Sequence, residues 1–143
     1  MITNRSMPPG IIIPELAYKD VAAATEWLCQ TFGFKERLRI GNHRRQLLFG
    51  GASVIVIDLN GEPTTESIAP QPRTHKIMVQ VPDVDRHYEI VRESDAKILS
   101  GPETYPFGER QYTVEDPGGH VWTFSQSVAD VSPAEWGGQF VNP

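Results

Sequence analysis

Apolar and polar positions follow one order twice along the chain. Residues 11–18 are mostly apolar and partly β-branched, which predicts a strand. Asp20 can cap a helix over residues 21–32, whose apolar side chains recur at helical spacing. Gly33 supplies the left-handed position that ends such a helix. Three further strands are predicted, over residues 35–40, 45–49 and 53–59.

The same order returns after residues 60–72, a segment with three prolines and almost no apolar side chains. A strand is predicted over 76–81, and Asp83 can cap a helix over 84–94. Strands then follow at 97–99, 110–114 and 121–125. Identities between the halves are few, so a chance match is the alternative. Repetition of the order predicts an α+β fold of two βαβββ modules.

This repeat predicts the domain organisation of the whole chain. We expect an N-terminal arm over 1–10, a first module over 11–59, a linker over 60–72 and a second module over 73–126. The tail, 127–143, contains Ser132-Pro133-Ala134-Glu135, which fits a capping box with proline at the first helical position. We therefore expect a short helix there that docks Trp136.

Composition limits the compartment and the partners. The chain has 143 residues with 18 acidic and 13 basic side chains, a net charge of −5, which argues against nucleic-acid binding. Its one cysteine, Cys29, cannot form an intrachain disulfide and is expected to be a buried structural thiol. The run Ile11–Ile13 is too short for a signal-peptide core or a membrane span. We expect a cytoplasmic protein with no membrane partner.

Three segments carry a resemblance to a known family. They are IIPELAYKDVAAATEWLCQTFGF, KIMVQVPDVDRHYEIV and YPFGERQYTVEDPGGHVWTFSQ. Their order and spacing resemble the vicinal oxygen chelate superfamily of glyoxalases, extradiol dioxygenases and bleomycin-resistance proteins. The last segment is most similar to a glyoxalase-like branch related to the phosphonate-operon protein. The resemblance implies two curled half-shells, together a cupped, mostly antiparallel, barrel-like sheet of eight strands around a pocket. It also implies a homodimer.

The same resemblance implies where a metal would be bound. The ligand positions of the family's enzymes correspond here to Ile13, Ile55, Lys76 and Thr123. Two of these side chains are hydrocarbon, one is cationic and one is a neutral hydroxyl, whereas a catalytic metal usually needs about three protein ligands. We therefore expect no metal and no other cofactor. A slip of one residue would instead bring His75 inward, with His120, Glu15 and Asp58 as possible companions, but it would turn apolar residues outward.

The alternation of strand side chains selects the residues that could line the pocket. They are Ile13, Glu15, Ile55, Lys76, Met78, Gln80, Arg110, Tyr112 and Thr123. Glu15 either contacts a ligand or pairs with Lys76 to neutralise two buried charges. Trp122 and Phe124 are expected to face the second helix, and His87 to lie on its solvated side. The loop over 105–109 carries two aromatic rings that could stack on a ligand or cover the end of the sheet.

Two main functions remain open. The first is a metal-free protein of the bleomycin-resistance kind, which would sequester an unidentified small organic molecule in the pocket. The second is a metal-dependent, glyoxalase-like lyase, isomerase or dioxygenase. The substitutions at the four metal positions favour the first. A structural or regulatory module with no ligand is the third possibility.

Overall fold

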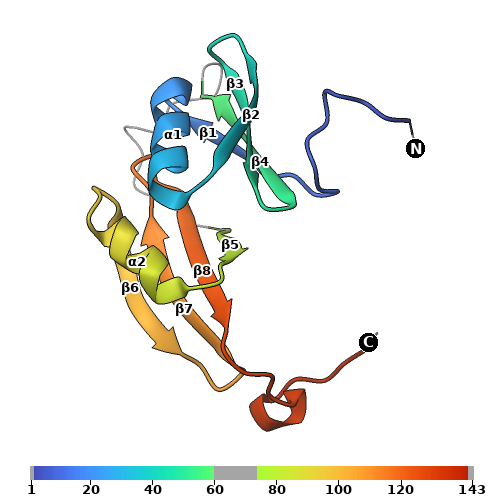
Figure 1. Ribbon diagram of the computed structural model, residues 1–143, viewed down its shortest axis with the longest axis vertical. Helices are drawn as coiled ribbons and strands as arrows, with labels where there is room; N and C mark the ends of the chain where they lie inside the picture. The colour runs from blue at the N-terminus through green and yellow to red at the C-terminus, as the bar shows by residue number, and fades with distance from the viewer. Residues whose placement is uncertain (1, 60–73, 142–143) are drawn as a thin grey trace. The chain divides into compact units, whose positions relative to one another are not determined.

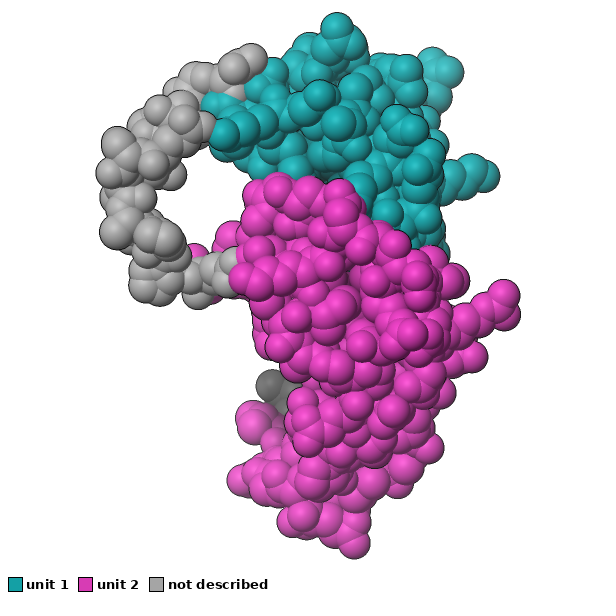
Figure 2. Space-filling model, turned by 90° about the vertical axis from the view of Figure 1, so that its left-hand side faces the viewer, with its two compact units in different colours: residues 1–71 teal, residues 72–143 magenta. Residues whose placement is uncertain are grey.

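The computed structural model describes residues 2–59 and 74–141. The predicted linker over 60–72 lies outside the described residues. The chain divides into two compact units, Met1–Gln71 and Pro72–Pro143, which are coloured separately in Figure 2.

The first unit is one βαβββ module (Figure 1). Its elements are β1 (Glu15–Tyr18), α1 (Val21–Trp27), the π-helical turn η1 (Leu28–Phe32), β2 (Lys35–Ile40), β3 (Arg44–Phe49) and β4 (Ala52–Asp58). The strand order is β1-β4-β3-β2, with β1 parallel to β4 and the other pairs antiparallel. Asp20 caps α1 by accepting a hydrogen bond from the backbone N of Ala23, at 3.0 Å. Gly33, with φ 95°, ends the helical segment.

The second unit repeats this plan. Its elements are β5 (Ile77–Gln80), α2 (Val84–Arg92), β6 (Lys97–Thr104), β7 (Glu109–Glu115) and β8 (Val121–Ser127). The order β5-β8-β7-β6 has the same parallel and antiparallel pairs as the first unit. Asp83 caps α2 through the backbone N of Arg86, at 3.1 Å. The predicted α+β fold is confirmed: eight strands form two mixed, mostly antiparallel four-stranded sheets, each with a helix.

Several elements differ in detail from the sequence prediction. The strand predicted over 97–99 continues to Thr104 as β6. The first strand begins at Glu15 instead of residue 11. Pro14, just before it, has no N–H to donate, although its oxygen accepts from the backbone N of Ile55 at 2.8 Å. The last five residues of the first helix, Leu28–Phe32, form a π-helical turn, a distinction that apolar spacing does not make. The tail helix is a single 3₁₀ turn, η2 (Pro133–Trp136), and Ser132 makes no side-chain capping bond. The capping-box prediction is therefore wrong.

Each sheet buries one face against its own helix. In the second unit this core includes Tyr112, Val114, Trp122 and Phe124, all 0% exposed. The Trp122 Nε1 donates to the Asp116 carboxylate at 3.0 Å, so the core is tied to the hairpin turn between β7 and β8. The other oxygen of Asp116 accepts from the backbone N of His120, at 2.9 Å. These bonds set the pairing of β7 with β8. Among the described residues, every helix is too short or too polar to cross a bilayer.

Candidate functional site

Each sheet has a second face, which its helix does not cover and which we call the helix-free face. On the first sheet this face carries Glu15, Gln46 and Ile55, because Ile55 is the register partner of both other residues. The Glu15 carboxylate pairs with Arg44 at 2.6 Å. The Glu15 carboxylate therefore has a charged partner within its own sheet, while its pairing with Lys76 stays a prediction. Ile13 is half-buried and lies just before β1.

The N-terminal arm lies against the first helix-free face. Gln46 donates its Nε2 to the backbone oxygen of Ser6 at 2.8 Å, and Arg37 donates to the oxygen of Arg5 at 3.0 Å. Arg37 also donates to the Gln46 side chain. Pro8 is buried, and Gln46 is only 3% exposed. In Figure 1 the arm leaves β1 on the side away from α1. This face is therefore already occupied, in part, by the chain itself.

The second helix-free face carries a band of polar side chains. Met78 and Gln80 of β5 pair with Thr123 and Ser125 of β8, so the four share a face. From β7, the Thr113 hydroxyl bonds that of Thr123 at 3.0 Å. Lys76 lies one residue before β5 and is exposed. The predicted residues Met78, Gln80 and Thr123 are thus brought together on one surface.

The Glu109 carboxylate is held at the end of this band. Its Oε1 accepts from the Ser125 hydroxyl at 2.7 Å and from the Gln111 amide at 3.0 Å. Glu109 is half-buried. Two donors on a carboxylate fix its position and compensate part of its lost hydration. The charge therefore has a defined place at the edge of the second sheet.

Arg110 and Tyr112 do not lie on the helix-free face, which corrects their predicted place in the pocket. Tyr112 is the register partner of Phe124, and its hydroxyl lies 2.5 Å from His87 Nδ1 on α2. Arg110 pairs with Asp85 of α2 at 3.0 Å. Burial raises the pKa of Tyr112, so its hydroxyl stays protonated.

His87 also differs from its prediction. Its ring lies 4.2 Å from that of Phe124, centroid to centroid, between the helix and the sheet. It is half-buried rather than on the solvated side of α2. The prediction that Trp122 and Phe124 form core is confirmed, since both are fully buried and the Phe124 ring contacts that of His87.

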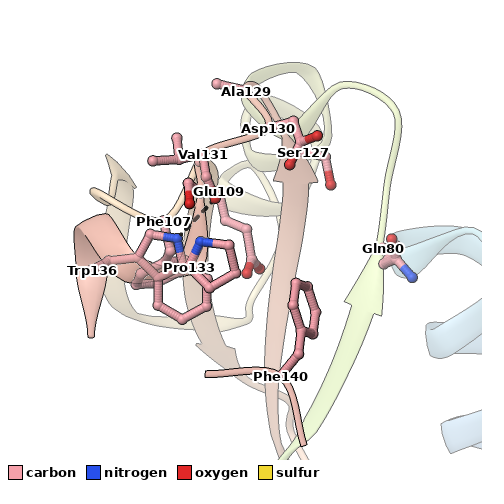
Figure 3. A pocket seen from close by; sticks show the side chains of 12 residues that line it. Gln80, Phe107, Glu109, Ser127, Ala129, Asp130, Val131, Pro133, Trp136 and Phe140 are labelled. Carbon is pink, nitrogen blue, oxygen red and sulfur yellow. Dashed lines mark hydrogen bonds between the residues drawn. The ribbon is translucent and has the colours of Figure 1, made fainter. Parts of the chain in front are cut away.

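A pocket of about 760 Å³ adjoins the end of the second sheet (Figure 3). Side chains from β5, β7 and β8 line one side, and the loop before β7 and the C-terminal tail line the rest. The lining residues are Gln80, Phe107, Gly108, Glu109, Ser127, Ala129, Asp130, Val131, Ser132, Pro133, Trp136 and Phe140. This volume is within the range of about 300–1,000 Å³ that small-molecule sites span.

Sequence reasoning identified only part of this pocket. It selected Gln80 and the loop that carries Phe107, but it treated the tail as structural. Two signals in the tail could have found the rest: the aromatic residues Trp136 and Phe140 lie beyond the last strand, where no core is predicted. Only the fold brings them back to Glu109 and Gln80.

A close backbone contact holds the pocket together at Gly108. The Gly108 oxygen accepts hydrogen bonds from the backbone N of Val128, at 2.8 Å, and of Ala129, at 3.2 Å. A Cβ added at Gly108 would lie 2.1 Å from the Ala129 oxygen. Gly108 also has φ +87°, which side chains rarely adopt. Only glycine lets the tail approach the β7 loop this closely.

Known proteins resemble this chain in sequence and in fold. The family model of the Glyoxalase/Bleomycin resistance protein/Dioxygenase superfamily matches residues 10–124. The chain belongs to this superfamily. TioX from Micromonospora sp. ML1 is 37% identical, with a TM-score of 0.68 over 82% of this chain and 98% of that one. A superfamily enzyme from Burkholderia phytofirmans PsJN shares the fold at 16% identity, with a TM-score of 0.67 over 80% of this chain and 96% of that one.

The curated relatives that the chain matches are longer proteins, and they are themselves uncharacterized. An uncharacterized protein of Mycobacterium bovis is 30% identical over 86 residues, which cover 60% of this chain and 49% of the relative. The chain spans about half the length of the curated relatives it matches. A lactoylglutathione lyase from Agrobacterium tumefaciens shares the fold at 16% identity, with a TM-score of 0.61 over 83% of this chain and 94% of that one.

The side chains at the four positions that correspond to metal ligands in enzymes of the superfamily do not suit a metal ion. Ile55 is hydrocarbon, and the Thr123 hydroxyl already bonds Thr113. Lys76 offers an ammonium and Ile13 a hydrocarbon side chain at the other two positions. In the parts of the chain that the structure describes, no three His, Cys, Asp or Glu side chains group to hold a metal ion.

The register of β5 also bears on the proposed slip of one residue. Met78 pairs with Thr123, so the helix-free face carries Met78 and Gln80, as the unslipped alternation predicts. His75 is exposed and precedes the strand. Asp58 is the register partner of Tyr18, which is buried in the core, so Asp58 lies on the helix side of its sheet.

Proposed function

We propose that this chain is a metal-independent binding protein of the glyoxalase/bleomycin-resistance type, which sequesters a small organic molecule. The observation that supports this most directly is the chemistry at Ile55, Thr123 and Lys76. These side chains give a hydrocarbon, an engaged hydroxyl and an ammonium where a catalytic metal would need lone pairs. The ligand would bind on the helix-free side of the second sheet, where the pocket lies.

The positions of the acid–base groups support binding rather than catalysis. His87 and Tyr112 bond each other between α2 and the sheet. Cys29 lies on the helix side of the first unit. Burial, and to a smaller extent the charge of Glu36, raises the pKa of its thiol, which lowers the fraction present as thiolate. These three groups, which could transfer protons or attack as nucleophiles, thus lie on the helix side of their sheets and not in the pocket. The pocket instead offers aromatic rings, amides and carboxylates.

Metal analysis and thermal unfolding test this proposal together. Protein purified without added metal should carry no stoichiometric zinc, nickel, manganese or iron, and its melting temperature should not rise when these ions are added. A library of metabolites and antibiotics should contain molecules that raise the melting temperature equally with and without chelator.

The opposite result would favour the metal-dependent enzyme. A rise of several degrees with zinc or nickel that chelator and His75→Ala both abolish would overturn the proposal. A Lys76→Glu variant is a useful control, because it removes the ammonium yet supplies one good ligand only. It should still gain nothing from added metal.

We also propose that the protein forms a homodimer. β1 and β2 are the edge strands of the first sheet, and β5 and β6 those of the second. Edge strands expose unpaired backbone groups that favour pairing. Light scattering should give twice the monomer mass at micromolar concentration, and a monomer mass throughout would contradict this.

A further inference from the structure

Aromatic rings form one wall of the pocket, and several contacts hold them. The Trp136 indole donates to the Val131 oxygen at 3.1 Å, and its ring lies 5.9 Å from that of Phe107 in an edge-on arrangement. Tyr105 stacks on Phe107 at 5.4 Å. Trp136 nevertheless remains 42% exposed, and Phe140 71%. These contacts thus position Trp136 and Phe107, while much of the Trp136 and Phe140 surface is open to a ligand.

The charges of the pocket have one sign. Glu109 and Asp130 are its ionisable lining residues, and among the described residues that line it none is basic. Glu109 is positioned by Ser125 and Gln111, which both bond its Oε1. In the view of Figure 3, the Glu109 carboxylate lies between the Trp136 indole and the Phe140 ring. A carboxylate attracts a cation by direct Coulomb attraction, and the face of an aromatic ring attracts it through the ring quadrupole. A pocket lined by both therefore favours a cation.

We propose that this pocket binds a lipophilic organic cation, a quaternary or protonated nitrogen on an apolar, ring-bearing body. The nitrogen faces Glu109 and Asp130, and the body packs on Trp136 and Phe140. The volume of about 760 Å³ admits a molecule of several rings. The aromatic wall offers contact area to an organic body, whereas it supplies no oxygen ligand to an inorganic cation. This inference rests on the proposed binding function and adds its site and ligand class.

Three probes with similar ring bodies and different charges test the class: N-methylacridinium, acridine at mildly alkaline pH where it is neutral, and anthracenecarboxylate. Each is titrated into the full chain in the presence of chelator, with probe fluorescence and calorimetry as readouts. We expect the cation to bind at least about tenfold more tightly than the neutral probe and the anion not to bind. Salt should weaken the binding of the cation.

Variants test the site. Trp136→Ala should weaken binding of the cationic probe at least about tenfold. Trp136→Phe should restore part of the lost affinity, because an aromatic ring is again present. The double variant Glu109→Gln, Asp130→Asn should weaken binding of the cationic probe by a similar factor and leave the affinity for neutral acridine unchanged. The matched control is Glu135→Gln, which removes a charge from the same 3₁₀ turn outside the pocket lining and should change affinity less than about twofold. Unchanged thermal unfolding of each variant shows that the fold is retained.

The outcomes separate this inference from the proposed function. The inference would be overturned if all three probes bound equally or if the cation did not bind. It would also be overturned if Trp136→Ala left the affinity for the cation unchanged. If library ligands then still bind without metal, the proposed function stands. Binding that appears only with zinc or nickel would overturn both.

Discussion

The two sheets have the same strand order and pairing, but their helix-free faces differ. On the first, Glu15 pairs with Arg44, and Gln46 and Arg37 bind the N-terminal arm. On the second, a band of hydroxyl and amide side chains leads to Glu109 and a pocket that the C-terminal tail completes. The repeated strand order sets the scaffold, and the two chain ends make the modules different. Five experiments compare sites in the two units, from the largest expected effect to the smallest.

The largest effect is expected at Gly108, where the tail meets the second sheet. Gly108→Ala places a Cβ 2.1 Å from the Ala129 oxygen, so the tail must move. We expect a loss of about 2–4 kcal/mol in the free energy of unfolding and loss of ligand binding. Gly119→Ala is the matched control, since Gly119 has nearly the same φ, +90°, with nothing within 4 Å of the added Cβ. Chemical denaturation should show a loss of only about 1 kcal/mol there. Equal losses would show that the contact with Ala129 contributes nothing.

The second effect compares an arginine–carboxylate pair on the helix side of each sheet. Arg45 is 5% exposed and pairs with Glu36 at 3.4 Å, whereas Arg110 pairs with Asp85, whose side chain is 58% exposed. Glu36→Gln leaves a buried guanidinium without its counter-charge and should cost about 1–3 kcal/mol. Asp85→Asn should cost less than about 1 kcal/mol, because water screens the exposed pair.

The pH dependence of the free energy of unfolding tests the contribution of the Glu36 carboxylate. The hydrogen bond from Arg39 holds the pKa of Glu36 below its usual range, and the charges of Arg39 and Arg45 add to this. A carboxylate with a lowered pKa stabilises the fold above its ordinary pKa, and this stabilisation is lost as the pH falls through the lowered value. The wild type should therefore lose more stability on acidification than Glu36→Gln. Parallel pH profiles would show that Glu36 contributes no linkage.

A smaller effect tests the N-terminal arm. Gln46→Ala removes the hydrogen bond to Ser6 and should cost about 1 kcal/mol. Trypsin should then cleave after Arg5 faster than in the wild type, while the second unit stays intact. Gln111→Ala, on the other helix-free face, is the control and should leave this cleavage unchanged. An unchanged rate in Gln46→Ala would mean that this bond does not hold the arm.

The smallest effect concerns Cys29. Because burial raises its thiol pKa, reaction with a thiol reagent at neutral pH should be slower than that of a free cysteine peptide. Cys29→Ala should change the free energy of unfolding by about 1 kcal/mol or less, since the residue is only half-buried. Reaction as fast as the peptide's would show that the thiol is not shielded.

Local patterns in the sequence determined the two modules. Asp20 and Asp83 cap the helices and Gly33 ends the first, and each of these features depends on neighbours within a few residues. Trp122 and Phe124 were readable as core from the alternation of side chains along their strand. The chemistry at Ile55 and Thr123 was also readable, because residue type alone decides which side chains can bind a metal.

Only the tertiary structure decided which face Arg110 and Tyr112 occupy and where the pocket lies. The hairpin turn held by Asp116 sets Tyr112 opposite Phe124, and alternation within one strand cannot reveal this pairing. Trp136 and Phe140 have no periodic pattern of their own. They become a wall only because Gly108 lets the tail approach the loop before β7, a contact between residues distant in sequence. Short-range patterns encode elements, whereas a site built from three strands and a tail depends on how those elements pair and pack.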